Sequence, residues 1–159
     1  MPDLRKTLRM ARDLFVYGLL TFPELLRGLT RQRFATHRAV LPDHVRLTVR
    51  YPGWPPIGAA IGAPGEHVYG VLLRDVDSDS LALLDCFEDT RDGLYTRGRR
   101  TVIVTNGECA HAEVYLCGDR VRNHLAGTWD ADAFAAAYYE HYRDVVIPEF
   151  LREYYEEDE

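Results

Sequence analysis

The amino-acid sequence predicts an α+β fold built on a twisted or barrel-like sheet. Segments with the alternation or the continuous apolar character of strands outnumber segments with helical periodicity. Asn106-Gly107 stands between two of these strand-like segments and is a strong signal for a tight antiparallel hairpin. From Asp130 the chain becomes helical. The predicted sheet therefore precedes a mainly helical C-terminal part.

The first part of the chain predicts a helix, a strand, a turn and a second helix. Residues 3–12 can form a short amphipathic helix with leucines on one side. The apolar run 14–17 is nearly continuous, which indicates a strand buried on both faces. Residues 18–21 form a turn after this strand. A helix then begins at Pro23 and continues to Leu29, because proline is accepted in the first helical turn.

The next part predicts two strands separated by irregular chain. Residues 33–50 carry strand-like stretches with alternating apolar positions. Residues 51–56 contain three prolines and a glycine, so they cannot form a helix or a central strand. Residues 58–65 are expected to continue as a flexible loop, and residues 67–73 form another strand.

A helix and the hairpin come next. Asp77 or Ser78 can cap a helix that ends near Glu88, and a polar turn comes after it. The hairpin strands are expected over 95–104 and 109–117. A cluster of arginines on the first of these strands has the period of a solvent-facing strand surface rather than of a phosphate site: Arg97, Arg99 and Arg100.

The C-terminal helix shows an apolar stripe. Phe134, Tyr138, His141 and Val145 fall at i, i+4, i+7 and i+11, which places them on one face. Pro148 is expected to break or kink this helix before a last helical segment.

Length and composition limit the class of protein. A chain of 159 residues fits one domain better than two, so we expect a single domain over residues 1–159 with a helical extension from about residue 130. The formal net charge of -6 and the lack of a dense basic stretch argue against a nucleic-acid partner. No apolar run approaches the length needed to cross a membrane, and the basic start lacks the apolar core of a secretion signal. The oligomeric state is left open.

The cysteines and histidines predict neither a disulfide framework nor a metal site. Cys86, Cys109 and Cys117 are an odd set without a CxxC pair, and a reducing cytoplasm is the simplest location for them. The six histidines are scattered, so we assign no metal and no metal ligand. No histidine is placed by sequence to activate Cys86 as a nucleophile, and a buried cysteine without catalytic function is the preferred interpretation.

Glu88 is the leading candidate for chemistry. Leu81, Leu84 and Glu88 fall at i, i+3 and i+7 of the predicted helix and share one face. A carboxylate at the end of an apolar stripe points toward a core or a closed pocket, where desolvation raises its pKa. Such a carboxyl group can carry protons near neutral pH. The alternative is a solvated glutamate in the last turn of the helix.

Five short motifs, in this order, resemble the γ-glutamylcyclotransferase-like family, which includes the plant AIG2-like proteins and γ-glutamylamine cyclotransferase. They are Tyr17-Gly18-Leu19-Leu20, Tyr51-Pro52-Gly53, Val68-Tyr69-Gly70-Val71-Leu72, Leu84-Asp85-Cys86-Phe87-Glu88 and Tyr95-Thr96-Arg97. The family usually has threonine where this chain has Leu19, and often has glutamate where it has Val71. Both departures bear on the substrate, and neither removes the carboxylate at Glu88.

The resemblance implies a small mixed, mostly antiparallel β-barrel with flanking helices. It implies an enzyme without metal or cofactor that converts a γ-glutamyl amide into 5-oxoproline and a free amine. Glu88 matches the family's catalytic carboxylate and would act as general acid and base. Substrate binding would come from the turn after the first strand and from one aromatic ring that otherwise is a packed tyrosine: Tyr17, Gly18, Leu19, Leu20 and Tyr95.

The resemblance leaves the leaving amine and the pathway open. The substrate is expected to be a small γ-glutamyl amine or peptide. One alternative is removal of a γ-glutamyl group from a biosynthetic intermediate, such as an acylated aminoglycoside, or from a γ-glutamyl-lysine isopeptide; the negative charge mildly favours a cationic amine. A second alternative is a non-catalytic binding protein on the same scaffold, since fold alone does not decide function.

Overall fold

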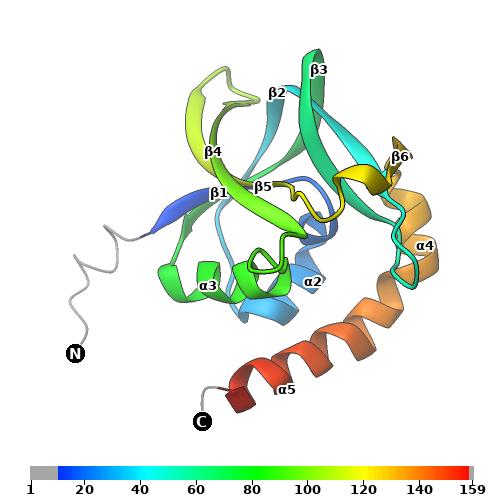
Figure 1. The fold of residues 1–159 in the computed structure, drawn as a ribbon. Helices are drawn as coiled ribbons and strands as arrows, with labels where there is room; N and C mark the ends of the chain where they lie inside the picture. The colour runs from blue at the N-terminus through cyan, green and yellow to red at the C-terminus, as the bar shows by residue number, and fades with distance from the viewer. Residues whose placement is uncertain (1–10, 158–159) are drawn as a thin grey trace, which may run out of the picture.

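In the computed structural model, which describes residues 11–157, five strands close into a small barrel (Figure 1). Each strand pairs with two neighbours in the ring β1-β3-β2-β4-β5-β1. Around this ring only the β5-β1 pairing is parallel, so the predicted α+β fold with a mostly antiparallel barrel is confirmed. The strands are β1 (Arg12–Val16), β2 (Thr36–Val49), β3 (Ile57–Val76), β4 (Tyr95–Val104) and β5 (Cys109–Cys117).

Helices cover one end and one side of the barrel. Figure 1 shows α2 and α3 beneath the barrel, with α5 running below them and α4 beside it. No helix within residues 11–157 is both long enough and apolar enough to cross a bilayer. The α-helices are α2 (Pro23–Thr30), α3 (Ser78–Phe87), α4 (Ala131–His141) and α5 (Ile147–Glu157). The short elements are the 3-10 helices η1 (Leu19–Thr21) and η2 (Arg122–His124), the π-helical turn η3 (Tyr142–Val146) and strand β6 (Leu125–Thr128), which extends the sheet beside β2.

Strand β1 is buried on both faces, as its apolar run predicts. Phe15 and Tyr17 belong to the core inside the barrel. Leu14 and Val16 point the other way and belong to the core between the barrel and the helices. The alternation of side chains along a strand thus lets one short segment hold two cores together.

One expectation about the N-terminal half is almost untested, and another is wrong. The helix expected over 3–12 falls almost entirely outside the described residues, and Arg12 already begins β1. The loop expected over 58–65 is wrong, because this segment is the first half of β3 and pairs with β2 from Ile57 to Gly62. Gly58 in this segment serves close packing, because a Cβ there would stand 3.0 Å from the ring of Trp129.

The predicted hairpin is confirmed. Strands β4 and β5 pair from Tyr95 with Cys117 to Ile103 with Cys109. The turn places Gly107 at a φ of 91°, which favours glycine. The hairpin therefore supplies two neighbouring strands of the barrel wall.

The apolar stripe predicted for the C-terminal helix is partly wrong. Phe134 is buried, but His141 and Val145 are exposed. His141 and Tyr142 are placed by the regular helix α4, and the buried face runs through Phe134 and Tyr142, at i and i+8, rather than through His141. After Tyr142 the π-helical turn η3 begins, in which the N–H of Ile147 donates to the carbonyl of Tyr142, five residues back. A π turn adds a residue to the helical repeat, so the next buried positions are Ile147 and Leu151 rather than Val145.

Pro148 neither breaks the helical path nor ends it. It stands in the first turn of α5, directly after η3, where a missing N–H is tolerated. The chain passes from α4 through η3 into α5 and stays helical to Glu157, with Pro148 in the first turn of α5.

Gly70 occupies a close crossing of strands β3 and β1. A Cβ at this position would stand 2.3 Å from the carbonyl oxygen of Val16 and 2.6 Å from the ring of Phe15. Neither neighbour can retreat easily, because one is backbone and the other is a fully buried ring. This close contact between β3 and β1 explains why the motif Val68-Tyr69-Gly70-Val71-Leu72 has a glycine at position 70.

Replacing Gly70 by alanine should destabilise the protein by about 1–3 kcal/mol through overpacking. Gly62 offers a matched control on the same strand, since a Cβ there would meet no atom within 4 Å. We expect Gly62→Ala to be neutral or slightly stabilising. Urea denaturation of both variants measures the difference. Equal free energies of unfolding for the two variants would show that an alanine side chain at position 70 is not overpacked.

Candidate active site

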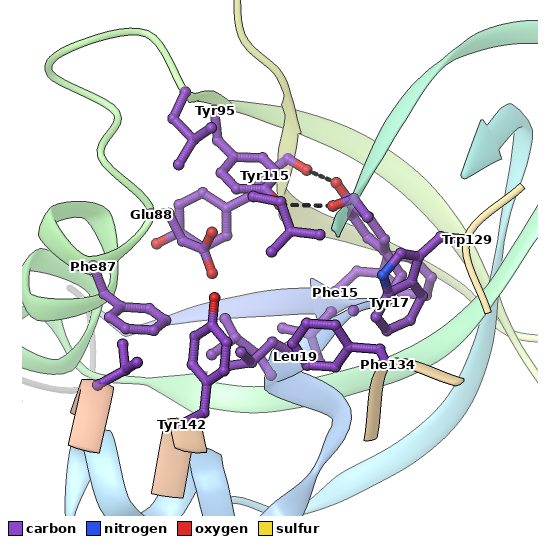
Figure 2. Close-up of a pocket in the computed structure, with 17 residues that line it drawn as sticks. Phe15, Tyr17, Leu19, Phe87, Glu88, Tyr95, Tyr115, Trp129, Phe134 and Tyr142 are labelled. Atoms are coloured by element: carbon purple, nitrogen blue, oxygen red, sulfur yellow. Dashed lines mark hydrogen bonds between the residues drawn. The ribbon is translucent and has the colours of Figure 1, made fainter. Parts of the chain in front are cut away.

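A cavity of about 180 Å³ opens between one end of the barrel and the C-terminal helical segment. Seventeen residues line it, and most of them are aromatic or aliphatic (Figure 2). None of the lining residues is a lysine, arginine or histidine. The structure brings all of the residues singled out from the sequence to this cavity: Tyr17, Gly18, Leu19, Leu20, Glu88 and Tyr95.

Glu88 stands at the C-terminal end of α3. The helix begins with Asp77, whose carboxylate accepts a hydrogen bond of 3.0 Å from the N–H of Ser80. Leu81 and Leu84 are buried against the core, as the predicted helix face requires. The N–H of Glu88 donates to the carbonyl of Leu84 at 2.8 Å, which continues the helical pattern to this residue. Anchored leucines thus set the direction in which the Glu88 side chain leaves the helix.

Three side chains fix the end of α3 to the barrel. Arg97 on β4 holds the carboxylate of Asp85 with two nitrogens, Nε at 2.9 Å and Nη2 at 3.1 Å. The hydroxyl of Tyr115 on β5 donates to the same carboxylate at 2.8 Å. Such bidentate pairing fixes geometry as well as contributing energy. Because Asp85 lies one helical turn before Glu88, this clamp positions the cavity carboxyl group.

The clamp also changes the interpretation of the arginine cluster. Arg99 and Arg100 are exposed, as predicted for an outward strand face. Arg97 is half-buried and pairs additionally with Glu113 at 3.1 Å. Period-2 alternation could not show this, because the partners come from α3 and β5.

Burial raises the pKa of the Glu88 carboxyl group to about 8. The residue as a whole is half-buried, since it lines a cavity that opens to solvent. Its carboxyl group is nevertheless surrounded by protein, and no basic side chain lines the cavity to stabilise the charged form. At neutral pH this group is therefore mostly protonated, and a small change in its surroundings makes it take up or release a proton.

Two tyrosine hydroxyls in the cavity wall are already hydrogen-bonded to the backbone. The hydroxyl of Tyr17 donates to the carbonyl of Tyr115 and accepts from the N–H of Ala60 at 3.0 Å. The hydroxyl of Tyr95 donates to the carbonyl of Gly58 at 2.6 Å. Burial raises the pKa of both Tyr17 and Tyr95 well above the ordinary value, so both are uncharged. They close the cavity floor and hold strands together.

Tyr142 is arranged differently. Figure 2 shows its hydroxyl pointing toward the Glu88 carboxyl group across the cavity. Burial, and secondly the proximity of Glu88, raises the pKa of Tyr142 to about 12. The side chain comes from the start of the π-helical turn η3, where regular α4 still sets its direction. Turns of this kind are frequent at functional sites.

The turn after β1 faces the same cavity. Its hydrogen bonds use the N–H groups of Thr21 and Phe22, which donate to Gly18 and Leu19 at 3.0 and 3.2 Å. The N–H groups of Leu19 and Leu20 precede these donors, and the turn supplies no acceptor for them. A Cβ on Gly18 would meet no atom within 4 Å, so this residue borders open space.

Sequence reasoning missed the wall that the C-terminal segment contributes. Trp129, Phe134, Tyr142 and Val146 line the cavity opposite the barrel. The ring nitrogen of Trp129 donates to the carbonyl of Pro56 at 2.9 Å, which holds the ring in place. Tyr142 and Val146 lie on the i, i+4, i+8, i+12 row that starts at Phe134 and Tyr138, so helical periodicity could have found them. The sequence analysis instead followed the row through His141 and Val145.

Cys86 does not belong to the site. It is exposed and does not line the cavity, so the expected buried position is wrong. Within residues 11–157 no group of three or more His, Cys, Asp or Glu side chains is placed to hold a metal ion. What the cavity presents is one carboxyl group with a pKa near 8, uncharged hydroxyls and apolar walls. This set can move a proton at a small polar group held in a mostly apolar space.

The chain is similar in sequence and in fold to known proteins. The family profile described as "Gamma-glutamyl cyclotransferase, AIG2-like" matches residues 14–131. "AIG2-like protein D" of Arabidopsis thaliana is 32% identical over 120 residues, which cover 74% of this chain and 75% of that protein.

Solved structures show the same fold at lower identity. The solution structure of an Arabidopsis thaliana protein aligns with a TM-score of 0.65 at 19% identity, over 84% of this chain and 86% of that one. A structure named gamma-glutamyl cyclotransferase aligns with a TM-score of 0.63 at 19% identity, over 74% of this chain and 69% of that one.

Replacing Glu88 by glutamine should stabilise the protein, and more so at alkaline pH. The carboxyl group ionises near 4.5 in an ordinary setting and near 8 in the fold, so the folded state binds more protons between these values. Stability of the unaltered protein therefore falls as the pH rises through this window, and glutamine removes the fall. We expect the variant to be more stable by about 1–4 kcal/mol at pH 9 and by much less at pH 5.

Urea denaturation at pH 5, 7 and 9 measures this difference. Glu149→Gln, at an exposed position of α5, is the matched control and should show no such trend. A stability gain at Glu88 that does not depend on pH would show that its carboxyl group is not desolvated.

Proposed function

This chain belongs to the AIG2-like gamma-glutamyl cyclotransferase family, and we propose that it converts a γ-glutamyl amide into 5-oxoproline and a free amine. The observation that carries the proposal is the position of Glu88. Its carboxyl group has a raised pKa and lines the same cavity as the turn of Gly18. Proton carrier and binding turn therefore meet in one place.

Glu88 is the proposed general base and acid. The α-ammonium group of the substrate gives a proton to the Glu88 carboxylate, and the resulting amine attacks the substrate's own γ-carbonyl carbon. A five-membered ring closes as the new C–N bond forms. The attacking nitrogen then releases a second proton, and the bond from this carbon to the leaving amine breaks. The leaving nitrogen takes up both protons, one of them returned by Glu88, and departs as an ammonium ion. No atoms are gained or lost, and no water is consumed.

This chemistry needs little beyond orientation and one proton carrier. The nucleophile is tethered to the carbon that it attacks, so the protein contributes by holding the substrate in a bent conformation. A carboxyl group with a pKa near 8 is matched to an α-amine, whose own pKa is about 8 in peptides. Proton transfer between two such groups is close to balanced in either direction.

The turn after β1 is the proposed site for the charged end of the substrate. The N–H groups of Leu19 and Leu20 begin a helical turn, where backbone donors favour an anion. Arg46 donates to the carbonyl of Tyr17 at 2.7 Å and adds a positive charge behind the turn. The substrate α-carboxylate would bind there, and the γ-carbonyl would then lie toward Glu88.

The alternatives have less support. A binding protein would gain nothing from a desolvated carboxyl group, which costs stability in its charged form. A bulky polycation such as an acylated aminoglycoside could place only its γ-glutamyl end in a cavity of about 180 Å³, which is little larger than one that holds benzene. A small γ-glutamyl amide is the simplest substrate for this space.

Glu88→Gln should abolish release of 5-oxoproline while leaving the protein folded. General acid–base catalysis contributes about 10²–10⁴ in rate, so we expect a loss of at least a hundredfold in kcat. The assay is a screen of γ-glutamyl amines, γ-glutamyl dipeptides and glutathione with 5-oxoproline as the readout. Glu149→Gln should retain full activity. Turnover of any of these compounds by Glu88→Gln at the unaltered rate would show that the assignment is wrong.

The pH profile of kcat/KM should report the raised pKa of Glu88. Below about pH 8 the carboxyl group carries its proton and cannot act as a base, so the rate should rise about tenfold per pH unit up to that value. At higher pH the free substrate loses its ammonium proton and the rate should fall, which gives a bell. The neighbouring hydroxyls of Tyr17, Tyr95 and Tyr142 titrate well above this range.

Initial rates between pH 5 and 10 measure the profile. An acid limb between pH 4 and 5 would mean that the essential carboxyl group is an exposed one rather than Glu88.

A further inference from the structure

The mouth of the cavity is apolar. Among the lining residues, those that keep part of their surface exposed include four aliphatic or aromatic side chains from separate elements: Leu19, Ile57, Phe87 and Val146. Leu19 comes from η1 and Phe87 from α3, while Val146 comes from η3. A group that extends from the enclosed glutamyl end toward solvent has to pass these side chains.

Aromatic rings continue this apolar surface away from the mouth. Phe87 packs edge-on against Phe150 of α5 with ring centroids 5.1 Å apart. Phe150 stacks in turn on Tyr154 at 5.7 Å. Both α5 rings are half-buried, so a ligand at the mouth can reach them. The mouth thus borders a row of partly exposed aromatic rings.

The cavity lining disfavours a charged leaving group of either sign. Among residues 11–157, no basic side chain lines the cavity to receive a carboxylate, such as that of a dipeptide or of glutathione. A cationic amine would find no charged partner among the lining residues either, because Glu88 is the one acidic residue among them and is mostly uncharged at neutral pH.

The two residues that depart from the family motifs, Leu19 and Val71, lie differently relative to the cavity mouth. Leu19, where the family usually has threonine, is itself a rim residue and replaces a hydroxyl by an isobutyl group. Val71 does not line the cavity. Of the two departures, Leu19 is therefore the one that can contact the substrate. Its leucine side chain offers the substrate an apolar contact in place of a hydroxyl group.

We propose that the leaving amine carries an uncharged apolar group, aryl or branched alkyl, which binds at the rim formed by Leu19, Ile57, Phe87 and Val146. This inference rests on the cyclotransferase activity proposed above. It goes further by naming the part of the substrate that the rim selects. Leu19, Ile57 and Phe87 lie within residues 14–131, the part that the family profile matches, and Val146 comes from the helical segment beyond it.

The first experiment compares three γ-glutamyl compounds that differ only in the leaving amine and its charge. They are γ-glutamylbenzylamide, γ-glutamylglycine and γ-glutamylputrescine, with 5-oxoproline as the readout. Burial of a phenyl-sized group at the rim predicts that kcat/KM for the benzylamide exceeds the other two by about tenfold to hundredfold. A higher kcat/KM for the glycine or the putrescine compound would overturn the inference while leaving the activity established. No 5-oxoproline from any of them would overturn both proposals.

The second experiment introduces a charge at the rim. Val146→Arg should lower kcat/KM for the benzylamide and raise it for γ-glutamylglycine, so that the preference between them falls by about tenfold or more. Val145→Arg is the matched control, since Val145 is the neighbouring residue, is 39% exposed and does not line the cavity. An equal shift in both variants would contradict the assignment of the rim.

A circular dichroism melt shows whether Val146→Arg folds. If it does not fold, a third variant tests the rim independently. Leu19→Thr restores the residue usual in the family and removes apolar area from the rim. It should reduce the preference for the benzylamide over γ-glutamylglycine by about threefold to tenfold. An unchanged preference in a folded Leu19→Thr protein would remove Leu19 from the rim and overturn the inference in this form.

Discussion

The site is organised around one carboxyl group that is kept partly out of water while it stays open to a cavity. The protein surroundings of Glu88 raise its pKa to about 8, and within residues 11–157 no basic side chain lines the cavity to compensate. A helix end tends to fray, so a group placed there needs support from outside the helix. Asp85, one turn earlier, provides it through Arg97 and Tyr115, which belong to two different strands. The barrel therefore acts as the frame that holds the last turn of α3.

The barrel alone would leave the carboxyl group exposed on one side, and the C-terminal segment closes that side. The sequence pattern predicts a buried stripe of Phe134, Tyr138, His141 and Val145. The structure instead buries Tyr142, which regular α4 directs toward Glu88, and the π turn η3 after it moves the next buried positions to Ile147 and Leu151. With the extra residue of the π turn, α5 packs on α2 while α4 covers the cavity.

The sequence allowed much of the fold and the Glu88 side of the cavity to be predicted, for local reasons. The two-faced burial of β1, the cap at Asp77 and the hairpin at Asn106-Gly107 depend on neighbours within a few residues. The errors have non-local causes. Gly58 is small because Trp129, far along the chain, packs against it. Arg97 is half-buried because α3 returns to it, and the tail stripe shifts after Tyr142 because of a π turn that periodicity does not encode.

In the proposed enzyme, the groups that act on the glutamyl part of the substrate differ from those that contact the leaving amine. Proton transfer and recognition of the glutamyl end belong to β1, η1 and α3, which lie within the family match at 14–131. The amine side of the cavity is lined by Leu19, Ile57 and Phe87 within that match and by Val146 of η3 beyond it. Cyclisation demands the same geometry whatever amine departs, so Glu88 and the residues that hold the glutamyl end are constrained by chemistry. Val146 is constrained by the shape of the amine, whereas Tyr142, one turn earlier, also faces Glu88 and is constrained by that carboxyl group (Figure 2).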